Sequence, residues 1–205
     1  MFIGKYNGSV ILTYLGVGIA ITGMWSALNG RPYQAMICLV LAGVCDLFDG
    51  SVAKLFQRDE AELAFGREID SLADMISFIA LPAVFALTMS GKAGLTVAAM
   101  VLYALAGIIR LGWFNIAGTE EVGEDRFYSG LPVTYAALIF PILFLPLSFL
   151  PGNVLHTVWP LLHLIVAGAF ILDFRIPKPD RSMSLKLALL AVIVIAAYVV
   201  RGVMA

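Results

Sequence analysis

The sequence predicts an all-α membrane protein, a polytopic bundle of six to seven transmembrane helices. Hydrophobic residues make up 61% of the 205 residues, charged residues make up 13%, and the mean hydropathy is +0.95. An ordinary globular domain carries roughly 25% charged residues, so most of this chain is expected to lie in lipid or against other apolar helices. The net charge of −1 lacks the basic excess of a nucleic-acid-binding protein, and no nucleic-acid partner is expected.

Seven apolar stretches are long enough to cross a bilayer as helices, which takes about 20 residues each. We place these stretches at 9–28, 34–57, 68–90, 94–115, 130–150, 154–173 and 183–203. The segment Pro151-Gly152-Asn153 separates the fifth stretch from the sixth and predicts a tight turn. No repeat or low-complexity segment divides the chain, so residues 1–205 are expected to form a single domain, and no signal peptide is expected at the N-terminus.

Basic residues fall unevenly on the two sides of such a bundle. With the N-terminus in the cytoplasm, ten lysines and arginines lie on the cytoplasmic side and three on the other, as the positive-inside rule requires. The cytoplasmic ten are Lys5, Lys54, Arg58, Arg67, Arg110, Arg126, Arg175, Lys178, Arg181 and Lys186, and the other three are Arg31, Lys92 and Arg201. All acidic residues also fall on the cytoplasmic side, which predicts a functional surface facing the cytoplasm.

Four aspartates interrupt the apolar pattern near the cytoplasmic ends of the second and third stretches. Asp46 and Asp49 belong to the second stretch, and Asp70 and Asp74 to the third. At about 100° per residue, each pair lies within about 60° on one helix face. Antiparallel helices joined by a short loop would bring the pairs together, where four carboxylates repel one another unless a cation neutralises them. Oxygen ligands suit Mg²⁺, Mn²⁺ or Ca²⁺, so the sequence predicts a divalent-metal site.

Other residues that often bind metals have a simpler interpretation here. Cys38 and Cys45 lie in apolar runs and are expected to be small packing residues, with no disulfide. His156 and His163 belong to the sixth stretch and are expected to be packed or interfacial side chains. A zinc site is therefore not expected.

Small residues flank the aspartates, with Gly50 and Ala53 after the first pair and Gly66 before the second. Small residues permit close packing of membrane helices, and beside carboxylates they also leave room for a bulky headgroup. Lys54 adds a cation where phosphates would bind.

Written out, this segment is D46-x2-D49-G50-x2-A53-K54-x11-G66-x3-D70-x3-D74. It resembles the signature of the CDP-alcohol phosphatidyltransferases, D-x2-D-G-x2-A-R-x8-9-G-x3-D-x3-D, and seven of the eight fixed residue types agree in order. Lys54 stands where the family usually has arginine, which keeps the charge but loses the bidentate fork. The eleven residues before Gly66 form a longer gap than is usual in the family.

Three further segments resemble the phosphatidylserine synthase branch of that family. EIDSLADMISF (68–78) looks like its E-x-D-S-L-x-D-x-x-S-F stretch, and RLGWFN (110–115) and FYSGLPVTYAA (127–137) look like its R-L-x-R-F-N and F-x-G-L-P segments. Trp113 replaces the usual second arginine of the R-L-x-R-F-N segment. The resemblance covers residues 46–137 and implies the fold of the family.

The resemblance also implies a reaction, in which a phosphatidyl group moves from CDP-diacylglycerol to L-serine and CMP leaves. It implies metal binding by Asp46, Asp49, Asp70 and Asp74, with Asp74 also the catalytic base. The CDP pocket would be formed by Asp49, Gly50, Ala53, Lys54 and Gly66, and serine or phosphate would be bound by Arg67, Arg110, Asn115 and Tyr128.

The same resemblance implies two divalent ions in the site, Mg²⁺ or Mn²⁺, with Ca²⁺ as an inhibitory substitute. It implies a homodimer among membrane lipids, in a prokaryotic plasma membrane with the active site facing the cytoplasm. Three alternatives stay open. The acceptor could instead be inositol, inositol phosphate or glycerol 3-phosphate, the donor could be an archaeal ether lipid, or the acids could form the pathway of a small cation transporter.

Overall fold

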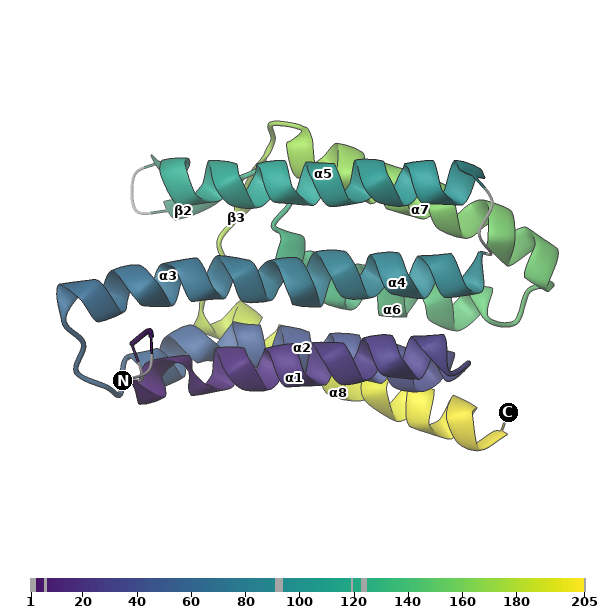
Figure 1. Ribbon diagram of the computed structural model, residues 1–205, viewed down its shortest axis with the longest axis horizontal. Helices are drawn as coiled ribbons and strands as arrows, with labels where there is room; N and C mark the ends of the chain where they lie inside the picture. The colour runs from purple at the N-terminus through teal and green to yellow at the C-terminus, as the bar shows by residue number, and fades with distance from the viewer. Residues whose placement is uncertain (1–2, 6, 91–93, 119, 123–124, 205) are drawn as a thin grey trace.

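A computed structural model describes residues 3–5, 7–90, 94–118, 120–122 and 125–204, of which most form long helices that run side by side (Figure 1). Among the described residues, six helical segments are long and apolar enough to cross a membrane. They are α1 (Ile11–Leu28), α2 (Pro32–Ala53), a rod made of α3 (Glu60–Asp74), η2 (Met75–Ala80) and α4 (Leu81–Met89), α5 (Gly94–Ala117), α7 (Gly152–Ile171) and α8 (Arg181–Met204). The predicted all-α membrane bundle is therefore confirmed.

The fifth predicted stretch, 130–150, forms a shorter helix than expected. It contains η3 (Val133–Tyr135) and α6 (Ala136–Leu147), and Gly130 begins it with a backbone φ of +79°, outside the helical range. The expected turn at 151–153 lies earlier, because Gly152 already begins α7.

Two other predicted boundaries move because hydropathy marks apolar residues and does not mark the residue at which a helix begins or ends. The helix predicted from residue 68 already begins at Glu60, and its first residues are charged and exposed. The helix predicted to reach residue 57 ends at Ala53.

Of the thirteen basic residues assigned to two sides, Lys92 lies outside the described residues, and the side chains of Arg126 and Arg181 are likewise not described.

Local signals explain where the first three helices begin and end. Gly30, at a φ of +68°, closes α1 with Arg31 N–H donating to the Ser26 carbonyl at 2.9 Å, and Pro32 starts α2 where its missing N–H is not needed. Asp59 and Glu62 form a reciprocal capping box at the start of α3. The backbone N–H of Glu62, together with Lys5, holds the pKa of Asp59 below its usual value.

Small residues let α1, α2 and α6 approach closely. A Cβ placed on Gly23 of α1 would lie 2.9 Å from Cβ of Cys38, and one placed on Gly43 of α2 would lie 2.5 Å from Cβ of Ala137. Carbon atoms prefer separations of about 3.5–4.0 Å, so neither position accepts a side chain without the helices moving apart. These contacts fix α2, which carries two of the aspartates.

The α3–η2–α4 rod changes its winding where the aspartates end. Asp74 is the last α-helical residue, and Met75–Ala80 form a π-helical segment. Pro82 follows and has no N–H to donate to the carbonyl of Phe78, four residues earlier. That carbonyl instead accepts a hydrogen bond of 2.6 Å from the buried Tyr103 hydroxyl of α5.

A small antiparallel sheet at one end of the bundle was not predicted. Its strands β1 (Glu120–Val122), β2 (Asp125–Ser129) and β3 (Arg175–Pro177) lie in that order, at the end where α3 begins (Figure 1). Tyr128 of β2 pairs with Ile176 of β3, so the sheet brings the chain after α7 beside the chain after α5.

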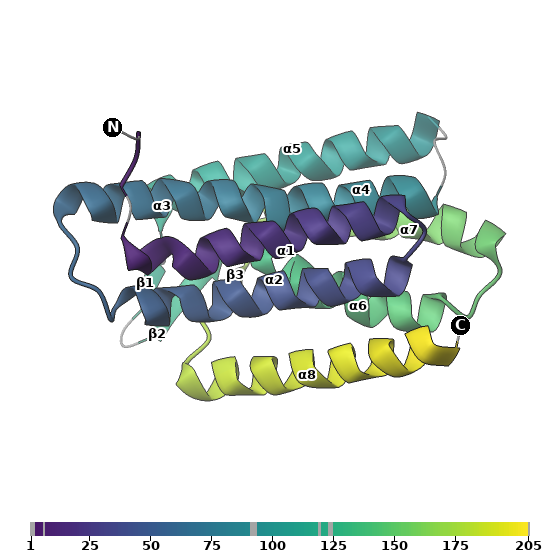
Figure 2. The same cartoon turned by 60° about the horizontal axis from the view of Figure 1, so that its bottom comes forward.

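Helix α8 lies along the flank of the bundle beside α2 (Figure 2). Near its C-terminal end the Tyr198 hydroxyl donates to the Pro141 carbonyl at 2.6 Å. The Arg201 guanidinium lies 4.6 Å from the ring centre of Phe149 and 5.4 Å from that of Tyr33. These contacts hold the end of α8 that lies farthest from the sheet.

Candidate active site

The four aspartates come together from two helices. Asp46 and Asp49 lie in the last turns of α2, and Asp70 and Asp74 lie in the last turns of α3. Carboxylate oxygens of Asp46, Asp49 and Asp70 approach one another within 4.8 Å. The Asp74 carboxyl group lies beside that of Asp46, and the Asp70 carboxyl group beside that of Asp49. The helical phase therefore places the two pairs face to face.

This acidic cluster is compatible with divalent metal binding. Among the described side chains, the ion pair within 4 Å joins Lys5 to Asp59, and no lysine or arginine pairs with the four aspartates. Thr13 of α1 donates to Oδ2 of Asp49 at 3.3 Å, a neutral contact that orients the carboxylate without neutralising it. Half-buried carboxylates at this spacing repel unless a cation lies between them, and oxygen donors suit hard divalent ions.

A cavity of about 470 Å³, which we call the α1–α3 cavity, opens on one side of the cluster. Its described lining comprises Ser9, Val10, Thr13, Asp49, Gly50, Ala53, Arg58, Leu63, Gly66, Arg67 and Asp70. No protein atom lies within 4 Å of a Cβ placed on Gly50, and the nearest atom to one on Gly66 is 4.0 Å away. Packing does not require glycine at either position, whereas a ligand that approaches the backbone would.

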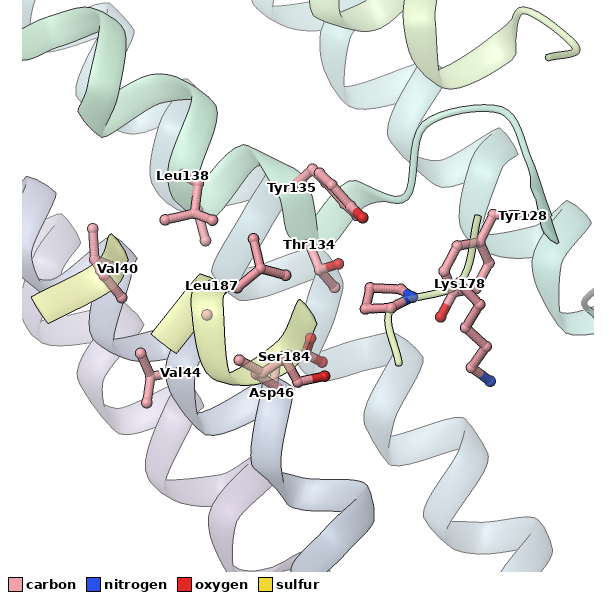
Figure 3. A pocket seen from close by; sticks show the side chains of 15 residues that line it. Val40, Val44, Asp46, Tyr128, Thr134, Tyr135, Leu138, Lys178, Ser184 and Leu187 are labelled. Atoms are coloured by element: carbon pink, nitrogen blue, oxygen red, sulfur yellow. The ribbon is translucent and has the colours of Figure 1, made fainter. Parts of the chain in front are cut away.

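A second cavity of about 250 Å³, the α2–α8 cavity, lies between α2, α6, α8 and the chain that leads into α8 (Figure 3). Its polar lining consists of Asp46, Tyr128, Thr134, Tyr135, Lys178 and Ser184, and the remainder is apolar. Burial raises the pKa of Tyr128, and nearby Tyr135 and Asp46 raise it further, so the phenol stays protonated and can donate a hydrogen bond.

A sequence profile described as CDP-alcohol phosphatidyltransferase matches residues 7–173, which include all four aspartates and the linings of the α1–α3 cavity. The chain belongs to this family. The CDP-alcohol phosphatidyltransferase signature predicted from residues 46–74 thus coincides with the acidic cluster.

Relatives within the CDP-alcohol phosphatidyltransferases are named for serine-containing products. The chain is 32% identical over 171 residues to CDP-diacylglycerol–serine O-phosphatidyltransferase of Mycobacterium leprae, covering 81% of this chain and 56% of that protein. It is 31% identical over 196 residues to the enzyme of the same name from Mycobacterium bovis, covering 91% of this chain and 67% of that protein. Archaetidylserine synthase of Methanothermobacter thermautotrophicus is 30% identical over 129 residues, covering 62% of this chain and 53% of that protein. The chain spans about half to two thirds of the lengths of these relatives.

Most residues predicted to bind CDP lie in the α1–α3 cavity, and Arg67, predicted for serine or phosphate, lines the same cavity. Lys54 differs, because it lies exposed just beyond α2 and outside the described lining. Arg58 lines the cavity from the segment that joins α2 to α3. It adds a cation at a position that the signature described above leaves unspecified.

Arg110 and Asn115, also predicted for serine or phosphate, lie elsewhere. The Arg110 guanidinium is buried and donates to the carbonyls of Leu131 at 3.0 Å and Gly130 at 3.3 Å. Asn115 accepts a hydrogen bond of 3.0 Å from the Ser71 hydroxyl, which joins α5 to α3. Neither residue is in the described lining of the α1–α3 cavity or the α2–α8 cavity, whereas Tyr128 lines the α2–α8 cavity.

Sequence patterns missed the cavity-lining residues Thr13, Thr134 and Lys178. Thr13 carries no signal, because a threonine in an apolar helix is common. Thr134 lies in the FYSGLPVTYAA segment, which resembled the family but assigned it no role. Lys178 precedes α8 and lies beyond the matched residues, so only the position of α8 brings it to the cavity.

Proposed function

We propose that this protein transfers the phosphatidyl group of CDP-diacylglycerol to L-serine, forming phosphatidylserine and CMP. The observation that carries the proposal is the cluster of four aspartates beside a glycine-lined cavity, in a chain of this family. The names of the Mycobacterium and Methanothermobacter relatives and the EIDSLADMISF segment support serine as acceptor. In this proposal residues 1–205 act as one catalytic domain.

The α1–α3 cavity would hold the cytidine diphosphate of the donor, with the lipid chains in the bilayer. Gly50, Ala53 and Gly66 leave room for the headgroup, and Arg58 and Arg67 place positive charge beside the phosphates. Asp46, Asp49, Asp70 and Asp74 would hold two divalent ions, Mg²⁺ or Mn²⁺, which when bound neutralise the diphosphate and the charge on the leaving phosphate.

The reaction requires one proton transfer and one displacement. Asp74 accepts the proton of the serine hydroxyl, whose oxygen forms a bond to the lipid-side phosphorus. The bond between that phosphorus and the bridging oxygen breaks, and the oxygen leaves with CMP. Such reactions depend on positioning and charge neutralisation more than on covalent chemistry from the protein. Asp74 is suited to the role because it lies beside the ligand carboxylate of Asp46.

The experiment that tests this function compares acceptors. Purified protein with CDP-diacylglycerol and Mn²⁺ or Mg²⁺ is offered L-serine, inositol or glycerol 3-phosphate, and CMP release and the lipid product are measured. We expect CMP and phosphatidylserine with serine. Turnover with inositol or glycerol 3-phosphate alone would refute the serine assignment, and a parallel assay with an ether-linked CDP-lipid defines the donor.

Two further features belong to the proposal. The ten-to-three distribution of basic residues supports a site that faces the cytoplasm of a prokaryotic plasma membrane. A reporter that is active only outside the cytoplasm should then work when fused after residue 205 and fail when fused before residue 1. The family resemblance supports a homodimer, which cross-linking in native membranes tests.

A further inference from the structure

The α2–α8 cavity and the α1–α3 cavity adjoin the acidic cluster from different parts of the bundle, one between α2, α6 and α8 and the other between α1, α2 and α3. The described residues that line the two cavities do not overlap. Asp46 lines the α2–α8 cavity and Asp49 lines the α1–α3 cavity, and both also line the small space among the four acids. The acidic cluster is therefore the place where ligands in the two cavities would meet.

Phosphoryl transfer constrains which ligand occupies which cavity. The attacking and leaving oxygens lie roughly in line with the phosphorus between them. If the α1–α3 cavity holds the departing cytidine monophosphate, the attacking hydroxyl must arrive from the opposite side. The α2–α8 cavity offers a separate approach to the cluster, and Asp46 in its lining lies next to Asp74.

The polar lining of this cavity complements a small acceptor that carries a carboxylate. Lys178 and Asp46 are the charged residues among its described lining, and they lie apart, with Lys178 at the outer side (Figure 3). The Lys178 ammonium lies 5.8 Å from the ring centre of Tyr128. Lys178 is exposed, and its flexible four-carbon stem lets the ammonium turn inward without backbone movement.

We propose that the α2–α8 cavity binds the acceptor alcohol, and that Lys178 and Tyr128 bind the acceptor's carboxylate. This inference rests on the proposed function and adds the residues that select the acceptor. Lys178 contributes the cation and Tyr128 a phenol hydrogen bond, while the acceptor hydroxyl extends toward Asp46 and Asp74. An acceptor that lacks a carboxylate gains nothing from Lys178.

The test compares Lys178→Ala with Lys186→Ala. Lys186 lies in the first turns of α8, eight residues after Lys178, and it is exposed and does not line the cavity, so its replacement removes an equal charge. Each protein is assayed with L-serine and with ethanolamine, which keeps the ammonium and hydroxyl of serine and lacks its carboxylate. A charge-assisted hydrogen bond justifies an expected increase in the KM for serine of about tenfold in Lys178→Ala.

The expected pattern is specific to carboxylate recognition. In Lys178→Ala the KM for CDP-diacylglycerol stays within about twofold of wild type, and the preference for serine over ethanolamine falls about tenfold. Tyr128→Phe should shift the same preference in the same direction by a smaller factor. Lys186→Ala should match wild type. Thermal unfolding midpoints of all variants identify any loss that comes from misfolding.

Two results would overturn the inference. One is an unchanged serine-to-ethanolamine preference in Lys178→Ala, and the other is a rise in the KM for CDP-diacylglycerol alone. Failure of the proposed function gives a different result, because wild-type protein itself would then release no CMP with serine. If wild type uses another alcohol that carries a carboxylate, an unchanged KM for that alcohol in Lys178→Ala also refutes the cavity assignment.

Discussion

Replacing Gly50 by alanine adds one methyl group at a point where the protein leaves open space. Because no atom lies within 4 Å of the added carbon, the fold should tolerate the change. Alanine also favours a helix over glycine by about 0.8–1.0 kcal/mol, so the unfolding midpoint should stay level or rise. The donor headgroup should lose contact with the backbone instead. Overpacking of about 1–3 kcal/mol corresponds to a KM for CDP-diacylglycerol raised about 5- to 140-fold.

Alanine substitutions at two other glycines serve as controls for Gly50→Ala. Gly18→Ala on α1 also meets no atom within 4 Å, but it lies outside both cavities and should leave the KM unchanged. Gly43→Ala would put two Cβ atoms 2.5 Å apart and should be less stable than Gly18→Ala by about 1–3 kcal/mol. Steady-state CMP release and thermal unfolding in detergent measure both quantities. A Gly50→Ala protein with wild-type KM would refute the placement of the donor in the α1–α3 cavity.

The acids and the rod give three more predictions. Asp74→Asn should lose turnover while still binding CDP-diacylglycerol in an equilibrium assay; near wild-type turnover would show that another group takes the proton. Excess chelator should abolish CMP release and added Mn²⁺ or Mg²⁺ should restore it, whereas full turnover in chelator would contradict metal dependence. Tyr103→Phe leaves the Phe78 carbonyl without its 2.6 Å donor and should reduce the free energy of unfolding by about 1–3 kcal/mol, and a midpoint equal to wild type would refute that role.

Helical periodicity was enough to predict the meeting of the four aspartates. Asp46 and Asp49, like Asp70 and Asp74, lie in regular α-helix, where about 100° per residue applies. Hydropathy also located the helices, because long apolar runs have one stable conformation in lipid.

Features that depend on contacts between distant segments were not predictable in this way. The π-helical segment at Met75–Ala80 carries no distinctive composition, and its support comes from Tyr103 on another helix. The sheet consists of strands of three to five residues, too short for an alternating pattern to stand out. Lys178 reaches a cavity only because β3 and α8 lie beside β2 and α2.

The π-helical segment also affects which way the side chains face in the two halves of the α3–η2–α4 rod. A π turn accommodates one residue more than an α turn, which rotates everything beyond it by about 100° relative to a continuous α-helix. The phase of Asp70 and Asp74 toward α2 is thereby independent of the phase of Phe85 and Ala86 in the core. If Met75–Ala80 were wound as a regular α-helix with no residue removed, the two halves could not both keep their present phases. Either the aspartates would leave the cluster or the α4 side chains would leave the core, so the winding of this segment is itself a determinant of the active site.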